Sequence, residues 1–145
     1  MRKMLVVVDG LSAARTRDAV NQAIGLYQQE PAEVHLLSVQ PRVSGDVAMF
    51  FGGPELHDLQ HGAGMDDLAP ARALLDLAGV PYQTSVHVGR SAQTIARIAR
   101  ELHCDRIVMG QDGSDHGLAR TLFGSVAAQV RQLLVGTGDC QVLGS

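Results

Sequence analysis

Short runs of consecutive apolar residues constrain the fold of this 145-residue chain more than any other feature. Residues 4–8 (MLVVV) are such a run, and the mainly apolar residues 34–39 (VHLLSV) are expected to form a second strand. Turn-forming or helix-breaking residues follow each of them. Unbroken apolarity, in contrast to alternation, is typical of strands that are covered on both faces, as in parallel sheets. Residues 82–88, 106–109 and 141–143 are expected to form three further strands.

Helical patterns separate these expected strands. Ser12 is a predicted N-cap, and Val20 and Ile24 then lie on one helical face. The other expected helices cover residues 66–78, 91–102 with Ser91 as N-cap, and 125–134. Alternating strands and helices predict a single α/β domain: a doubly wound, Rossmann-like, five-stranded and mostly parallel sheet with helices on both faces. In such sheets, ligands bind beyond the carboxyl ends of the strands.

The sequence predicts one domain over residues 1–145, with a long loop at residues 41–65. This segment is rich in glycine and shows no regular apolar period. Loops of this length in compact domains are typically lids, binding loops or disordered segments.

Composition excludes several classes of partner. The net charge is −3, so no basic excess indicates a nucleic acid or an anionic membrane as a partner. No apolar run approaches the length of a membrane span, and the amino terminus does not resemble a signal peptide, so we expect a cytoplasmic protein. Cys104 and Cys140 lack any paired spacing and are expected to be buried thiols.

The segment at residues 109–130, MGQDGSDHGLARTLFGSVAAQV, combines many glycines with an expected strand and helix. Glycine lets several backbone N–H groups converge on an anion, and a helix N-terminus adds unpaired N–H groups. Gly124 and Ser125 lie at the expected start of the last helix. A phosphate cradle and a tight turn that needs glycine only for its geometry are both consistent with this segment. The sequence contains neither a P-loop nor a GxGxxG fingerprint.

Several motifs resemble those of the universal stress protein family in order and spacing. They are VVVDG at 6–10, VHLLSV at 34–39, GVPYQTSVHVG at 79–89, and RIVMG with the glycine segment at 106–125. The most specific is the family's nucleotide motif G-x2-G-x9-G-[S/T], to which Gly110, Gly113, Gly124 and Ser125 correspond. The resemblance covers nearly the whole chain.

This resemblance implies a function as well as a fold. The family has a five-stranded parallel α/β domain, often forms homodimers through the last strands, and includes members that bind ATP with Mg²⁺. It implies a regulatory or stress-protective role, with at most slow ATP hydrolysis and no dedicated catalytic residue. Asp9 would lie near the nucleotide or its metal, and Val39 would contact adenine through its backbone. The residues that would surround the ribose and phosphates are Met109, Gly110, Gly113, Gly124, Ser125 and Val126.

Two departures from the family pattern keep a second function open. Ten residues instead of nine separate Gly113 from Gly124, and Leu11 stands where the family usually has serine. These departures favour an interaction module that keeps the fold, has lost nucleotide binding, and acts by dimerisation or by docking a protein partner. The glycines and Ser125 favour nucleotide binding.

Histidines supply the remaining alternatives. His116 in the glycine segment, or the 41–65 loop acting as a lid, could serve a small-molecule enzyme. His57 and His61 have the i, i+4 spacing of a shared metal site on a helix. The consecutive residues Ser114, Asp115 and His116 cannot form a catalytic triad, because adjacent residues do not reach triad geometry.

Overall fold

The computed structural model describes residues 2–41, 53–110, 118–135 and 140–143, with backbone only for 53–54 and 118–125. Within these residues, five strands form one parallel sheet, which confirms the predicted five-stranded, mostly parallel sheet. The strand order is β3-β2-β1-β4-β5. The strands are β1 (Lys3–Val7), β2 (Glu33–Gln40), β3 (Tyr82–Val88), β4 (Arg106–Met109) and β5 (Gln141–Leu143). The helices are α1 (Ala13–Gln29), α3 (Gly53–Ala78), α4 (Ser91–Glu101) and α5 (Leu118–Leu133).

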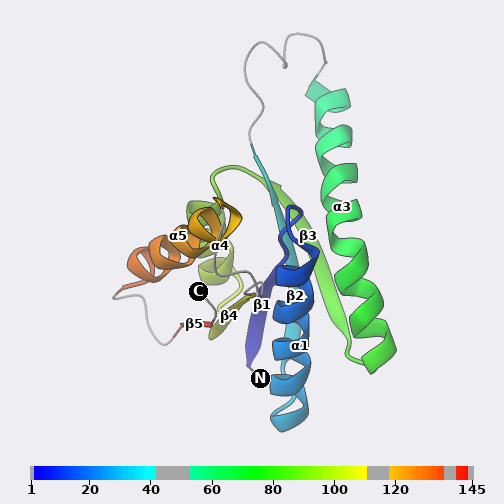
Figure 1. Ribbon diagram of the computed structural model, residues 1–145, viewed down its shortest axis with the longest axis vertical. Coiled ribbons are helices and arrows are strands. Elements are labelled where there is room, and N and C mark those ends of the chain that lie inside the picture. Colours follow the sequence, from blue (N-terminus) through cyan, green and yellow to red (C-terminus); the bar gives the residue numbers. More distant parts are fainter. Residues whose placement is uncertain (1, 42–52, 111–117, 136–139, 144–145) are drawn as a thin grey trace.

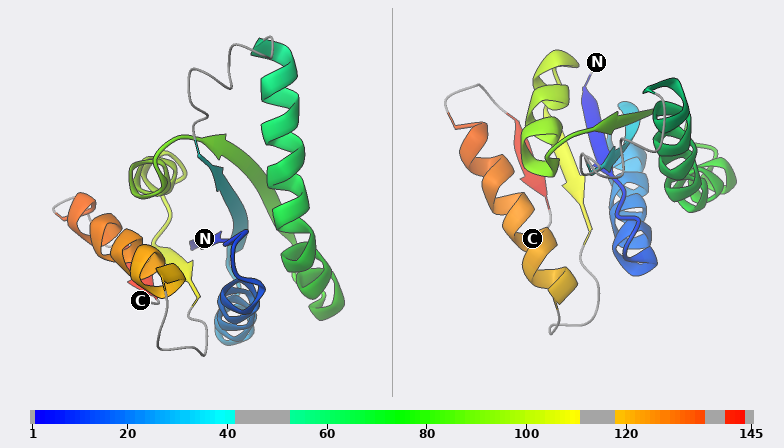
Figure 2. Two further views of the ribbon diagram at one scale, coloured as in Figure 1. Left: turned by 45° about the horizontal axis from the view of Figure 1, so that its top comes forward. Right: turned by 90° about the horizontal axis from the view of Figure 1, so that it is seen from above.

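Helices cover both faces of the sheet, α1 and α3 on one face and α4 and α5 on the other (Figures 1 and 2). Side chains alternate between the two faces along each strand. Val6 and Leu36 therefore pack with α1 and α3, whereas Leu5 and Leu37 pack with α4 and α5. Both core clusters are buried, which explains the unbroken apolar run at residues 4–8.

The amino ends of α1 and α4 are formed differently. Ser12 caps α1, because its hydroxyl accepts a hydrogen bond from the backbone N–H of Arg15 at 3.1 Å. The prediction of Ser91 as an N-cap is wrong by one residue. Arg90 occupies the cap position of α4 without a side-chain hydrogen bond, and Ser91 is the first helical residue.

The predicted loop at residues 41–65 is too long. Helix α3 begins at Gly53, so residues 53–65 are helical, while residues 42–52 lie outside the described residues. The glycines hid the helical pattern in the sequence. At Gly64 the absence of a side chain serves close packing, because a Cβ there would overlap the side chain of Val86 on β3. Pro54 is tolerated because it lies in the first turn of the helix.

The predicted start of the last helix is also wrong. Helix α5 begins at Leu118, so Gly124 and Ser125 lie inside it and not at its amino end. Leu118, Ala119 and Arg120 are good helix formers. A single glycine inside a helix costs only about 1 kcal/mol relative to alanine, so Gly124 does not end the helix.

The order of the strands determines where a ligand can enter. The chain passes from β1 outward through β2 to β3, and then returns to the other side of β1 to form β4 and β5. The switch point therefore lies between β1 and β4, beyond their carboxyl ends. In the described ranges, no helix is long and apolar enough to cross a membrane.

Candidate functional site

A cavity of about 540 Å³ lies at the carboxyl ends of β1 and β2. Its volume falls within the range of about 300–1,000 Å³ that is typical of small-molecule sites. Helices α3, α4 and α5 complete its walls, with apolar contributions from Ile95 and Val126 and polar ones from Asp67 and Ser91. The full lining is Val7, Val8, Asp9, Gly10, Leu11, Val39, Gln40, Pro41, Ala63, Asp67, Ser91, Ile95 and Val126.

Asp9 is held firmly at the end of β1. Its Oδ1 accepts a hydrogen bond of 2.8 Å from the N–H of Leu11. The hydroxyl of Thr16 accepts a hydrogen bond from the Asp9 N–H at 3.0 Å and donates one to the Asp9 carbonyl at 3.1 Å. The first turn of α1 therefore fixes the backbone of Asp9, and the turn that precedes this helix fixes its carboxylate.

Arg15 places a buried positive charge beside this carboxylate. The residue is 1% exposed, and its Nε lies 3.7 Å from Oδ2 of Asp9. Its Nη1 donates a hydrogen bond of 3.5 Å to the carbonyl of Gly110. One guanidinium thus joins residues that follow β1 and β4, the two strands that flank the switch point.

Gly110 is the first glycine of the nucleotide motif, and the structure gives it a packing role. A Cβ at this position would overlap the backbone carbonyl of Arg15 and lie 2.9 Å from the backbone nitrogen of Ala19. Helix α1 therefore approaches the end of β4 so closely that no side chain fits. At Gly110, tight packing alone accounts for the glycine.

The opposite wall of the cavity is polar. Oδ2 of Asp67 on α3 accepts a hydrogen bond of 2.9 Å from the side-chain amide of Gln40, whose Nε2 lies 3.0 Å from the Ser38 hydroxyl. A Cβ on Gly10 would overlap the Asp67 carboxylate, so Gly10 admits this side chain to the end of β1. Asp67 thereby connects α3 to the ends of β1 and β2.

The structure brings together some of the predicted site residues. Asp9, Val39 and Val126 line the same cavity. Met109 and Gly110 are buried but do not line this cavity; Met109 belongs to the core between the sheet and helices α4 and α5. Gly113 lies outside the described residues, as do the side chains of Gly124 and Ser125, whose backbone belongs to α5.

Sequence reasoning missed Arg15, Gln40 and Asp67. An arginine in the first turn of a helix ordinarily faces solvent, and nothing in the local sequence indicates that Arg15 is buried. Asp67 was assigned to a helix, but its reach to Gly10 and Gln40 depends on how α3 lies on the sheet. The one signal in the sequence for these three residues was the polar Gln40, which directly follows the strand expected at residues 34–39.

The described residues do not offer a ready-made metal site. They contain no group of three or more His, Cys, Asp or Glu side chains that could hold a metal ion. His57 and His61 stack on α3 with ring centroids 6.2 Å apart, without a third ligand from the described residues. Asp9 fits Mg²⁺ poorly, because a cation bound to it would face the guanidinium of Arg15. His116 lies outside the described residues.

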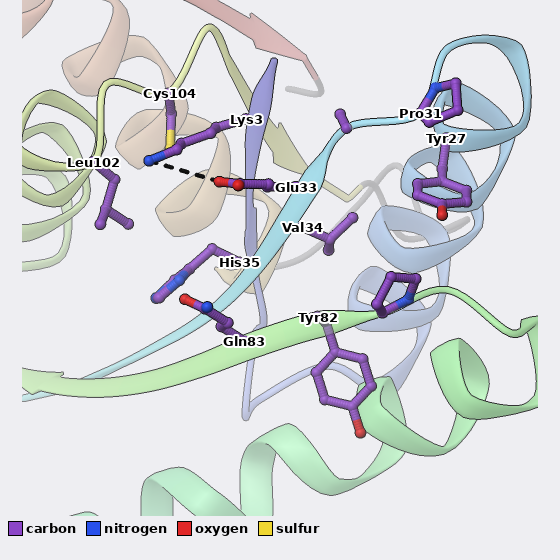
Figure 3. A pocket seen from close by; sticks show the side chains of 12 residues that line it. Lys3, Tyr27, Pro31, Glu33, Val34, His35, Tyr82, Gln83, Leu102 and Cys104 are labelled. Atoms are coloured by element: carbon purple, nitrogen blue, oxygen red, sulfur yellow. Dashed lines mark ion pairs between the residues drawn. The ribbon is translucent and has the colours of Figure 1, made fainter. Parts of the chain in front are cut away.

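A second cavity, of about 350 Å³, lies at the amino ends of β1, β2 and β3. Figure 3 shows that β2 divides it, with Tyr27 and Tyr82 on one side and Lys3, His35 and Cys104 on the other. Burial, together with the nearby charges of His87 and Lys3, lowers the pKa of His35. This cavity lies at the end of the sheet opposite to the switch point, so we assign the candidate site to the carboxyl end.

A model of the universal stress protein family matches residues 1–134 of the chain. Of the described elements, the match covers β1 to β4 and the helices α1, α3, α4 and α5, and it ends before β5. It therefore includes every residue that lines the cavity at the carboxyl ends of the strands.

Solved structures of the same family share the fold at low sequence identity. One is a universal stress protein in complex with cAMP, 21% identical, with a TM-score of 0.70 over 99% of this chain and 96% of that chain. A family protein from Arabidopsis thaliana with AMP bound is 16% identical, with a TM-score of 0.64 over 99% and 90%. A third, from Archaeoglobus fulgidus in complex with dAMP, is 17% identical, with a TM-score of 0.65 over 99% and 97%.

Proposed function

Because this chain belongs to the universal stress protein family, we propose that it binds an adenine nucleotide in the cavity at the carboxyl ends of β1 and β2. The observation that carries the proposal is the cavity itself, which combines a suitable volume with apolar walls and a few convergent polar groups. Three structural neighbours, bound to cAMP, AMP and dAMP, support an adenine ligand.

The lining suggests how the base and ribose are held. Val39, Ile95 and Val126 offer apolar surface for a planar base, and the backbone of Val39 lies at the end of β2. Asp9, Gln40 and Asp67 supply hydrogen-bonding groups at the polar wall. The base then lies between α4, α5 and the strand ends, with the ribose toward Asp9.

Phosphate groups would extend toward the segment that follows β4. Gly113 belongs to that segment, and α5 begins at Leu118, so the first free N–H groups of the helix are closer to Gly113 in the sequence than predicted. Arg15 offsets the negative charge of Asp9, which lowers the repulsion between this carboxylate and an anionic ligand. With ATP, Mg²⁺ would be held mainly by the phosphates, as is usual for this ion.

The proposed role is regulatory or stress-protective, in the cytoplasm and as a homodimer, without a dedicated enzymatic activity.

One observation favours the alternative of an interaction module without a nucleotide. Because α5 begins at Leu118, Gly124 and Ser125 do not supply the helix N-terminus that the phosphate cradle was predicted to use.

Calorimetric titration of the full chain with AMP, and with ATP and Mg²⁺, tests the proposal. Val39→Glu adds a carboxylate to the cavity wall and is expected to weaken binding at least about tenfold, because like charges repel in a partly desolvated site. Gln83→Glu introduces the same group at the exposed edge of the other cavity and is expected to leave binding unchanged.

Two results would reject the proposal. The first is the absence of binding up to millimolar nucleotide by a folded wild-type chain, which would favour the interaction module. The second is equal weakening by both variants, which would mean that charge acts at long range and not at the cavity.

A further inference from the structure

Cys104 and Cys140 lie together in the fold although the sequence separates them widely. Both contribute to one cavity of about 420 Å³ beside α4 and α5, and both pack against the same core cluster. Cys104 is buried and Cys140 is half-buried, and both are free thiols. The cysteines therefore share one face of the sheet and one pocket.

The pairing of β4 and β5 places their backbones at a suitable separation. Arg106 and Gln141 are register partners, and the N–H of Gln141 donates a hydrogen bond of 2.8 Å to the carbonyl of Asp105. In this register Cys140 lies opposite Asp105, so Cys104 is its diagonal neighbour, one residue earlier along the chain that leads into β4. Neighbouring strands lie about 4.8 Å apart and successive residues about 3.3 Å apart, so diagonal neighbours are about 6 Å apart, within the roughly 4.4–6.8 Å that is usual for the Cα atoms of a disulfide.

We propose that Cys104 and Cys140 form a reversible dithiol–disulfide pair that fastens the edge strand β5 to the chain just before β4. The oxidant is a small-molecule disulfide of the glutathione type. Strand β5 spans only Gln141–Leu143 and is bonded to β4 alone in the described sheet. A covalent bond at its start therefore restrains an edge that few hydrogen bonds hold.

The exchange proceeds in two balanced steps. The more accessible Cys140 thiolate attacks one sulfur of the oxidant, the sulfur–sulfur bond of the oxidant breaks, and one glutathione leaves and takes up a proton. The Cys104 thiolate then attacks Sγ of Cys140 and releases the second glutathione. The protein loses two protons and two electrons, and one glutathione disulfide becomes two glutathione thiols.

The environment makes this reaction slow at neutral pH and faster in base. Burial, and the neighbouring Cys140, raise the pKa of Cys104 to about 11. Burial and the charge of Asp105 also raise the pKa of Cys140. Because only the thiolate is nucleophilic, the rate of exchange is expected to rise roughly tenfold per pH unit below these pKa values.

The test incubates the full chain with oxidised glutathione at pH 7 and pH 9. The protein is then alkylated under denaturing conditions, and its mass is measured by mass spectrometry. The expected product is a monomer that has lost two hydrogen atoms, resists alkylation, and forms faster at pH 9. Dithiothreitol should restore both thiols. The oxidised protein should unfold at a Tm higher by about 5 °C or more, because the bond closes the loop from residue 104 to residue 140.

Single variants separate the two steps. Cys104→Ala should stop at a mixed disulfide with glutathione on Cys140, and Cys140→Ala should leave Cys104 largely unmodified because it is buried. A persistent mixed disulfide in the wild-type protein, a disulfide-linked dimer, or two thiols that remain free at pH 9 would each overturn the proposal. An internal disulfide that leaves the Tm unchanged would contradict the proposal that this bond restrains β5.

Discussion

Each end of the sheet carries an ion pair, but the two pairs differ in how exposed they are to solvent. At the amino end, the charged groups are at the surface, as in the 3.6 Å ion pair between Lys3 and Glu33. At the carboxyl end, the side chain of Arg15 is 1% exposed and that of its partner Asp9 is 9% exposed. Burying charge is costly unless it is paired, so a fold keeps such a pair where position matters. The comparison indicates that the carboxyl end has a defined arrangement of charges around its cavity.

The largest expected effect comes from breaking the buried pair. Arg15→Met removes the cation beside Asp9 and should lower the free energy of unfolding by about 3–5 kcal/mol. Lys3→Met breaks the exposed pair at the amino end and should cost at most about 1 kcal/mol. Urea unfolding of both variants measures the difference. Equal losses of unfolding free energy would mean that the ion pair at the carboxyl end contributes no more to stability than the exposed pair at the amino end.

A second contrast concerns two glycines that differ in their surroundings. Gly110→Ala should destabilise the fold by about 3 kcal/mol, because the new Cβ overlaps the backbone of Arg15 and helix α1 must move. Gly25→Ala on α1 meets no atom within 4 Å and should stabilise the fold by about 0.5–1 kcal/mol. Thermal unfolding followed by circular dichroism compares them. A harmless Gly110→Ala would show that α1 does not require the glycine.

The smallest expected effect is a dependence of folding stability on pH, which arises from His35 at the amino end of the sheet and His87 on β3. Burial lowers the pKa of His35 and His87 in the folded protein, so the neutral imidazoles are favoured by folding. Between these lowered pKa values and the ordinary value of 6.5, the unfolded chain binds more protons. Stability should therefore be complete above pH 6.5 and fall as the pH drops below it.

Chemical unfolding at pH 5 and pH 7.5 measures this dependence. His35→Gln should reduce the difference between the two pH values, since it removes one of the two groups. His57→Gln, on the exposed side of α3, serves as the control for removing an imidazole and should not reduce it. A pH dependence unchanged by His35→Gln would exclude His35 as its source.

Strand positions could be predicted from the sequence because they depend on local apolarity. The strands at residues 82–88, 106–109 and 141–143 were located correctly, and those at β1 and β2 to within a residue at each end. Helix starts at Gly53 and Leu118 were missed, because glycine reads as a break when its neighbours are unknown. Glycines that serve close packing, as Gly64 does against Val86, can be interpreted only once the packing is seen.

The candidate site was predicted less completely than the fold. Asp9, Val39 and Val126 were identified through a family resemblance and line one cavity. Arg15 and Asp67 depend on tertiary contacts with residues distant in the sequence, to Gly110 for Arg15 and to Gln40 for Asp67. No local pattern of residue types encodes such contacts, so sequence reasoning alone could not find them.

Backbone amide shifts of the ¹⁵N-labelled chain on titration with AMP test the central claim most directly. We expect the shifts to cluster at the carboxyl end of the sheet, at Asp9, Gln40 and Val126, while Tyr82, Gln83 and Cys104 at the amino end stay unchanged. Shifts that cluster at the amino end, or no shifts at millimolar AMP, would contradict the account.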